Sequence, residues 1–119
     1  QIFAITSHLP HLIAYNLILT ATNFKNSNKN NILKFSAGGL RDFSRIAASN
    51  EIMWRDIFFD NKINMLKVID LFINNLKSFK REIKLNKKSL EIKLKKLKKV
   101  RQKIISLKQD TSKPDFGRI

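Results

Sequence analysis

Helix-breaking residues are scarce in this chain, and that scarcity constrains its fold more than any other feature of the sequence. Glycine occurs only at positions 38, 39 and 117, and proline only at positions 10 and 114, so Arg41 to Thr111 contains neither. Glycine and proline interrupt helices more strongly than any other residues. The chain is therefore predicted to form one all-α domain, residues 1–119, built of long amphipathic helices.

The first helix is predicted from about Ile2 to Thr22, where apolar residues recur with helical spacing. Pro10 should kink or restart it, because proline lacks an N–H and its ring crowds the carbonyl of Thr6. The polar stretch Asn23–Asn31 is predicted to be a loop, followed by a short helix around Ile32–Phe35.

A glycine pair and a short helix are expected in the middle of the chain. Gly38 and Gly39 would permit a tight backbone passage that side chains would block. Leu40–Ala48 is predicted to be helical, and Ser49 or Asn50 is a candidate N-cap for the helix that follows.

Two longer helical patterns follow. The first begins near Glu51 and is predicted to end or bend near Leu76–Ser78. The second is an apolar stripe of heptad type with lysines on the other faces, which fits equally a helix packed on its own domain and a helix in a dimer. Asn86 within the stripe would cost stability but could fix register. The stripe consists of Leu76, Phe79, Ile83, Asn86, Leu90, Leu94, Leu97, Val100, Ile104 and Leu107.

The net charge raises the question of a polyanionic partner. Lys and Arg number 24 against 9 Asp and Glu, a formal charge of +15. One interpretation is a basic nucleic-acid-binding module that uses Lys77–Lys108 as a phosphate-facing surface. That segment has a single aromatic residue, Phe79, and so lacks the interleaved aromatic residues that would stack on bases; a nucleic-acid partner is not favoured over ordinary solvated lysine faces.

Several classes of site are excluded or disfavoured by composition. There is no cysteine, and two histidines with few carboxylates leave little material for a metal site. The longest apolar stretch, Leu9–Ala21, is interrupted by Pro10, His11 and Asn16 and falls short of the roughly 20 residues of a membrane span. The domain is therefore expected to be soluble, and its location is expected to be cytoplasmic. Because the chain begins with Gln1 rather than Met, we expect an excised or processed piece of a protein.

Two polar clusters are candidates for function. His8 and His11 are three residues apart, which places them on one helix face unless Pro10 changes their projection; such a pair is also common on surfaces and in cores. Asp42 and Arg45 form an i, i+3 pair that needs no functional explanation. Arginine nevertheless grips a carboxylate through two parallel hydrogen bonds, which lysine cannot copy.

Three blocks carry a family resemblance. They read SHLPHLIA at residues 7–14, AGGLRDFSRIAAS at residues 37–49 and MWRDI at residues 53–57. Together they resemble, in order and separation, the signature blocks of the C-terminal domain of the prephenate dehydrogenase family. The basic helix from Ile73 to Leu107 matches only in its periodicity and in its Val100-Arg101 end.

The resemblance implies an all-helical domain that forms an intertwined homodimer and closes a substrate cleft against a Rossmann domain on its N-terminal side. The family oxidises prephenate or arogenate with NAD or NADP in tyrosine biosynthesis, coupling hydride transfer to loss of the ring carboxylate as carbon dioxide. Tyrosine, the later product, could inhibit by resembling the substrate. The glycine-rich dinucleotide fingerprint and the catalytic histidine of the family do not occur in this chain, so the isolated chain is expected to be inactive.

The resemblance also implies site residues. His8 and His11 would line the substrate cleft, with His11 near the substrate side chain, and Arg45 would anchor a substrate carboxylate. Gly38, Asp42 and Trp54 resemble positions that line or gate the pocket near the dimer interface. Taken alone, Trp54 is equally well interpreted as a core anchor. A purely structural coiled-coil dimer stays open as a further alternative, because the heptad pattern alone also predicts it.

Overall fold

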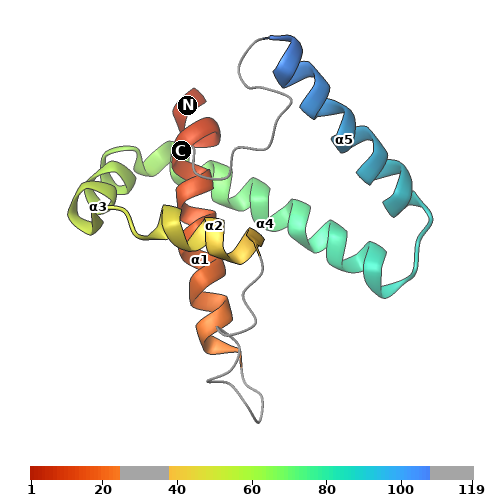
Figure 1. The fold of residues 1–119 in the computed structure, drawn as a ribbon, viewed down its shortest axis with the longest axis horizontal. Helices are drawn as coiled ribbons and strands as arrows, with labels where there is room; N and C mark the ends of the chain where they lie inside the picture. Colours follow the sequence, from red (N-terminus) through yellow and green to blue (C-terminus); the bar gives the residue numbers. More distant parts are fainter. Residues whose placement is uncertain (25–37, 108–119) are drawn as a thin grey trace. The chain divides into compact units, whose positions relative to one another are not determined.

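All regular structure that is described is helical, which confirms the predicted all-α class for residues 1–24 and 38–107, the residues that this computed structural model describes. Two compact units meet within one long helix, between Asp70 and Leu71. The predicted loop and the short helix at Ile32–Phe35 lie almost wholly outside the described residues. In chain order the elements are η1 (Ala4–His8), α1 (Leu9–Asn23), α2 (Gly38–Ala47), α3 (Glu51–Asp60), α4 (Lys62–Lys84) and α5 (Ser89–Ser106) (Figure 1).

The first helix changes from π to α bonding at Leu9, next to Pro10, where the sequence predicts a kink or a restart. The Leu9 N–H donates to the carbonyl of Ala4, five residues back, which is the bonding of a π turn rather than an α turn. Pro10 then lies in the first turn of α1, where its missing N–H leaves no hydrogen bond unmade. The wider turn of η1 thus accommodates the proline ring without ending the helix.

Gly38 and Gly39 begin α2 instead of forming a tight passage. Neither has a positive φ, and a Cβ built on either would meet no atom within 4 Å. The expectation that side chains would block the backbone here is therefore wrong for the described residues. α2 continues to Ala47 and packs across α1, as Figure 1 shows with α2 in yellow.

α3 begins at the predicted N-cap but ends earlier than the predicted helix. The Asn50 side-chain oxygen accepts the Met53 N–H at 2.9 Å, an interaction typically worth about 1 kcal/mol. The prediction of one helix from Glu51 to about Leu76–Ser78 is wrong. The helix is interrupted at Asn61, and a second helix, α4, continues from Lys62 to Lys84.

The apolar stripe is likewise divided, at Asn86. This residue has φ +50°, and around it the Lys87 N–H donates to the Glu82 carbonyl at 3.0 Å and the Asn86 N–H to the Ile83 carbonyl at 3.3 Å. These two bonds close the end of α4 as a Schellman motif, whose left-handed residue is usually glycine and sometimes asparagine. The prediction that Asn86 sits in a continuous heptad seam is wrong, since it turns the chain between two helices.

A partly buried ion pair, Glu82–Lys93, joins the two helices on either side of this turn. Glu82 on α4 is 7% exposed and accepts hydrogen bonds from the Lys93 ammonium, from Ser89 at 3.3 Å and from Ser78 at 3.4 Å. The Lys93 ammonium also lies 4.3 Å from the centre of the Phe79 ring. The hydrogen bond from Lys93 is the main cause that lowers the pKa of Glu82, and it outweighs the opposing effect of desolvation.

This lowered pKa predicts that acid weakens the packing of α4 on α5. A carboxyl whose pKa is depressed in the folded state stabilises it above the unfolded value, here near 4.5, and that contribution is lost as the pH falls through the folded pKa. Thermal melting followed by circular dichroism between pH 6 and pH 3 should therefore show a decline that Glu82→Gln reduces. Glu91→Gln, at an exposed carboxyl on α5, is the control. An equal decline in wild type and Glu82→Gln would contradict the prediction.

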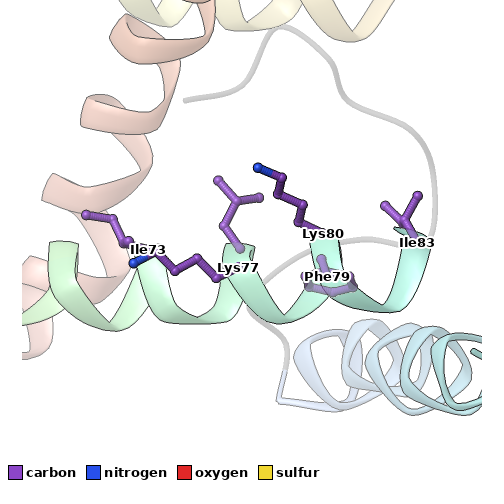
Figure 2. A pocket seen from close by; sticks show the side chains of 6 residues that line it. Ile73, Lys77, Phe79, Lys80 and Ile83 are labelled. Atoms are coloured by element: carbon purple, nitrogen blue, oxygen red, sulfur yellow. The ribbon is translucent and has the colours of Figure 1, made fainter. Parts of the chain in front are cut away.

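Few apolar side chains are fully buried. Among the described residues the buried apolar set is Ala4, Ala14, Trp54 and Met65. Large apolar side chains remain exposed in both units, and on the second unit some of them line a groove of about 400 Å³ along α4. Figure 2 shows this groove, with Lys77 and Lys80 between Ile73, Phe79 and Ile83.

Candidate functional site

His8, His11 and Trp54 come together in the first unit. The His11 ring stacks on the Trp54 indole with centroids 3.7 Å apart and planes 16° from parallel. The His8 ring meets the same indole edge-on, at 6.0 Å and 81°. Trp54 is 7% exposed, so one buried indole from α3 orients two imidazoles from η1 and α1. We call these three residues the imidazole–indole cluster.

The two imidazoles have different hydrogen-bond partners. The Nδ1 of His11 lies 3.1 Å from the carbonyl oxygen of Ser7, one turn earlier. The Nδ1 of His8 lies 3.1 Å from the side-chain nitrogen of Asn61, at the break between α3 and α4. Asn61 was not predicted as a site residue, because its only sequence signal is a polar residue inside a helical pattern.

Two further rings, Phe58 on α3 and Tyr15 on α1, extend the cluster. Phe58 packs on Trp54 at 5.6 Å between centroids, and Tyr15 meets Phe58 edge-on at 6.4 Å. The Tyr15 hydroxyl is buried and has no hydrogen-bond partner among the described residues. A buried hydroxyl without a partner loses its hydration without compensation, typically at a cost of about 1–3 kcal/mol.

Tyr15→Phe is therefore expected to raise the free energy of unfolding by about 1–3 kcal/mol, because only the unsatisfied oxygen is removed. Urea denaturation followed by circular dichroism would measure this change. A loss of more than about 1 kcal/mol would mean that the hydroxyl is bonded to a group beyond the described residues.

Asp42 and Arg45 form an ion pair on α2, through the Arg45 Nη2 and an Asp42 carboxylate oxygen. The Arg45 side chain is 50% exposed and that of Asp42 24%. α2 packs against α1, the helix that carries His11. Among the described residues, no hydrogen bond or ring contact joins this ion pair to the imidazole–indole cluster, whose imidazoles contact Ser7, Asn61 and Trp54.

The other candidate position, Gly38, lies at the start of α2 with open space around it. On the first unit, an apolar hollow of about 280 Å³ adjoins Phe58, with Leu12 and Met65 in its wall and Lys62 as its charged member. Within residues 1–24 and 38–107, no three His, Asp or Glu side chains gather closely enough to hold a metal ion. No helix in the same part of the chain is long and apolar enough to span a membrane.

The fold and this cluster define the class of the protein: an all-α domain in which η1, α1 and α3 contribute a cluster of imidazole and aromatic rings. Residues 1–108 match the family model described as prephenate dehydrogenase, dimerization domain. The chain therefore belongs to the prephenate dehydrogenase dimerization-domain family, as the three sequence blocks predict.

Individual relatives agree with this assignment. The chain is 41% identical over 83 residues to the cyclohexadienyl dehydrogenase of Zymomonas mobilis. The aligned region covers 70% of this chain and 28% of that protein. It is 37% identical over 73 residues to the prephenate dehydrogenase of Bacillus subtilis, covering 61% of this chain and 19% of that protein.

A solved structure is also similar. It is the prephenate dehydrogenase of A. aeolicus in complex with hydroxyphenyl propionate and NAD+, with a TM-score of 0.78 and 38% sequence identity. The similarity covers 87% of this chain and 36% of that chain. The chain thus spans about a third, or less, of the length of these relatives.

Proposed function

We propose that this chain is the helical domain of an NAD- or NADP-dependent dehydrogenase that oxidatively decarboxylates prephenate or arogenate in tyrosine biosynthesis. The observation that carries the proposal is the family match over residues 1–108. The solved relative supports the substrate class, because it is in complex with a hydroxyphenyl acid, hydroxyphenyl propionate, together with NAD+. In such an enzyme this domain supplies association between subunits and one wall of the substrate pocket.

The dinucleotide does not fit this chain alone. The glycine-rich turn that places a pyrophosphate at a helix N-terminus is absent from the sequence, and the described residues contain no strand on which such a turn could be built. The nicotinamide, when bound by a separate N-terminal Rossmann domain, would accept the hydride. The residues of this chain would bind and orient the substrate beneath it.

Arg45 is the proposed carboxylate anchor. Its guanidinium combines charge with a fixed direction, and fixing one carboxylate of a dianionic substrate also fixes the ring carbon that must face the nicotinamide. Its half-exposed position on α2, next to α1, is compatible with a ligand reaching it. Asp42 would orient Arg45 through their ion pair, and Gly38 would leave space at the start of α2.

The imidazole–indole cluster is the proposed inner wall of the pocket. His11 would lie near the substrate side chain and His8 beside it, both held against Trp54. Stacking on a buried indole restricts each imidazole to a narrow range of orientations, which is the form of preorganisation that substrate positioning requires. Trp54 would then serve as both core anchor and pocket wall.

The proposed assembly is an intertwined homodimer. The family model is that of a dimerization domain, and each unit of this chain leaves large apolar side chains exposed, such as Phe59, Ile63 and Ile83. Obligate dimer interfaces resemble a domain core cut in half, and these exposed side chains have that character.

The test joins this segment to the nucleotide-binding half of its own polypeptide and measures reduction of NAD and NADP with prephenate and with arogenate. Turnover with either substrate supports the proposal, and inhibition by added tyrosine would extend it. No turnover with any of the four combinations would count decisively against it. Salt-sensitive binding of nucleic acid by an inactive protein would instead favour the basic-module alternative.

A further inference from the structure

Asn61 joins two parts of the first unit that are distant in sequence. It lies between α3 and α4 with φ −107° and ψ 29°, where its N–H donates to the Ile57 carbonyl at 3.2 Å and its carbonyl accepts the Met65 N–H at 2.9 Å. Its backbone is therefore fixed by both helices. From this position its side-chain nitrogen reaches the Nδ1 of His8 at 3.1 Å.

A second asparagine is bonded to the oxygen end of the Asn61 amide. The Asn64 side-chain nitrogen donates to the Asn61 Oδ1 at 2.8 Å. With the oxygen end at Asn64, the Asn61 NH2 group is the one that faces His8. An NH2 group can only donate, so the Nδ1 of His8 must accept.

This contact selects one tautomer of His8. When Nδ1 accepts a hydrogen bond, the proton of a neutral imidazole resides on Nε2, which is then a donor. His11 is bonded in the opposite sense, because the Ser7 carbonyl can only accept and requires a proton on Nδ1. The Nε2 of a neutral His11 is therefore an acceptor, and the two imidazoles on Trp54 present opposite polarities.

We propose that Asn61, held by Asn64, is a positioning residue that makes His8 a hydrogen-bond donor at Nε2 whether or not the imidazole is protonated. Such a donor suits an oxygen of an acidic substrate, so this role rests on the proposed function. It gives His8 and His11 different tasks: His8 donates to the ligand at any pH, whereas His11 donates through Nε2 only after it is protonated.

Asn61→Asp tests the tautomer directly, since it replaces the donor with an acceptor of nearly the same shape. The complete enzyme is labelled with ¹⁵N-histidine, and the His8 signals are assigned by their loss in His8→Asn. In wild type without substrate, the neutral ring of His8 should carry its proton on Nε2 and none on Nδ1. In Asn61→Asp the neutral ring should carry its proton on Nδ1, and the carboxylate should favour the imidazolium to a higher pH.

The activity readout follows from the same switch. Asn61→Asp should approach wild-type kcat/KM at low pH, where the imidazolium still donates from Nε2. At high pH it should fall about tenfold below wild type, the loss of roughly one hydrogen bond. Asn75→Asp, at an exposed position on α4, carries the same charge change. The ratio of its kcat/KM to that of wild type should not vary with pH.

A wild-type spectrum with the proton on Nδ1 of His8, or a variant spectrum unchanged by Asn61→Asp, would overturn the proposal. So would a kcat/KM ratio that does not vary with pH. If Asn61→Asp does not fold, the spectra of the wild type and of Asn64→Ala test the proposal instead. Asn64→Ala releases the Asn61 amide, so the neutral His8 ring should populate both tautomers in that variant. The spectra need no substrate, so an enzyme inactive on prephenate and arogenate would refute the proposed function without deciding the tautomer.

Discussion

Replacing Arg45 by alanine is expected to lower kcat/KM for prephenate or arogenate by about 30- to 150-fold, equivalent to about 2–3 kcal/mol. The expectation follows from the proposed anchor, since a hydrogen-bonded pair between a guanidinium and a substrate carboxylate is lost and nothing of similar charge and direction replaces it. Initial rates over a range of substrate concentrations in the complete enzyme would measure the change. KM should also rise, because Arg45 would already bind the substrate carboxylate in the enzyme–substrate complex before the reaction.

Three variants separate this role from others. Arg55→Ala removes a similarly exposed arginine that pairs with its neighbour Asp56, and it should leave the rate unchanged. Arg45→Lys retains the charge but not the planar fork and should recover part of the loss. Asp42→Asn removes the carboxylate of the ion pair and tests whether orientation of Arg45 matters. A change in melting temperature without a change in kcat/KM for Arg45→Ala would demote Arg45 to a structural residue.

Trp54→Ala is expected to lower the free energy of unfolding by about 3–5 kcal/mol. The indole is 7% exposed and contacts His8, His11 and Phe58, so its removal leaves a cavity bordered by one ring from η1, one from α1 and one from α3 itself. Urea denaturation followed by circular dichroism would measure the loss. A fall of less than about 1 kcal/mol would contradict the packing described here.

Trp54→Phe divides the two interpretations of this residue. If Trp54 is a core anchor alone, phenylalanine should retain most of the stability and kcat/KM should follow the folded fraction. If Trp54 also forms the pocket wall, kcat/KM should fall at temperatures where the variant is fully folded. The His11 ring should then also lose its nearly parallel contact, which the wild-type indole provides at 3.7 Å.

The fold was predictable where a single residue determines the backbone. Pro10 and Asn50 act through their own chemistry, a missing N–H and a short side-chain acceptor, and both mark helix boundaries where expected. Asn61 and Asn86 also interrupt helices, but asparagine is tolerated inside helices and breaks them only when the surrounding structure favours it. The apolar period continued across both breaks, which is why two longer helices were predicted in error.

The candidate site was predictable in part for the same reason. The spacing of His8 and His11 places them on one face, and their meeting with Trp54 depends on how α3 packs, which local pattern does not encode. The contact of Asn61 with His8 depends on the helix break that the sequence pattern concealed. Similarly, Glu82 and Lys93 would be about 16 Å apart along a continuous helix and meet only because Asn86 turns the chain.

The small number of buried apolar side chains ties folding to protein concentration. Within residues 1–24 and 38–107 the buried apolar set is Ala4, Ala14, Trp54 and Met65, so in the proposed homodimer most of the hydrophobic stabilisation arises only after a second copy arrives. Folding and dimerisation are then one coupled equilibrium, so the denaturation midpoint rises with the protein concentration. Dilution alone would therefore dissociate and unfold the proposed homodimer, with no denaturant present.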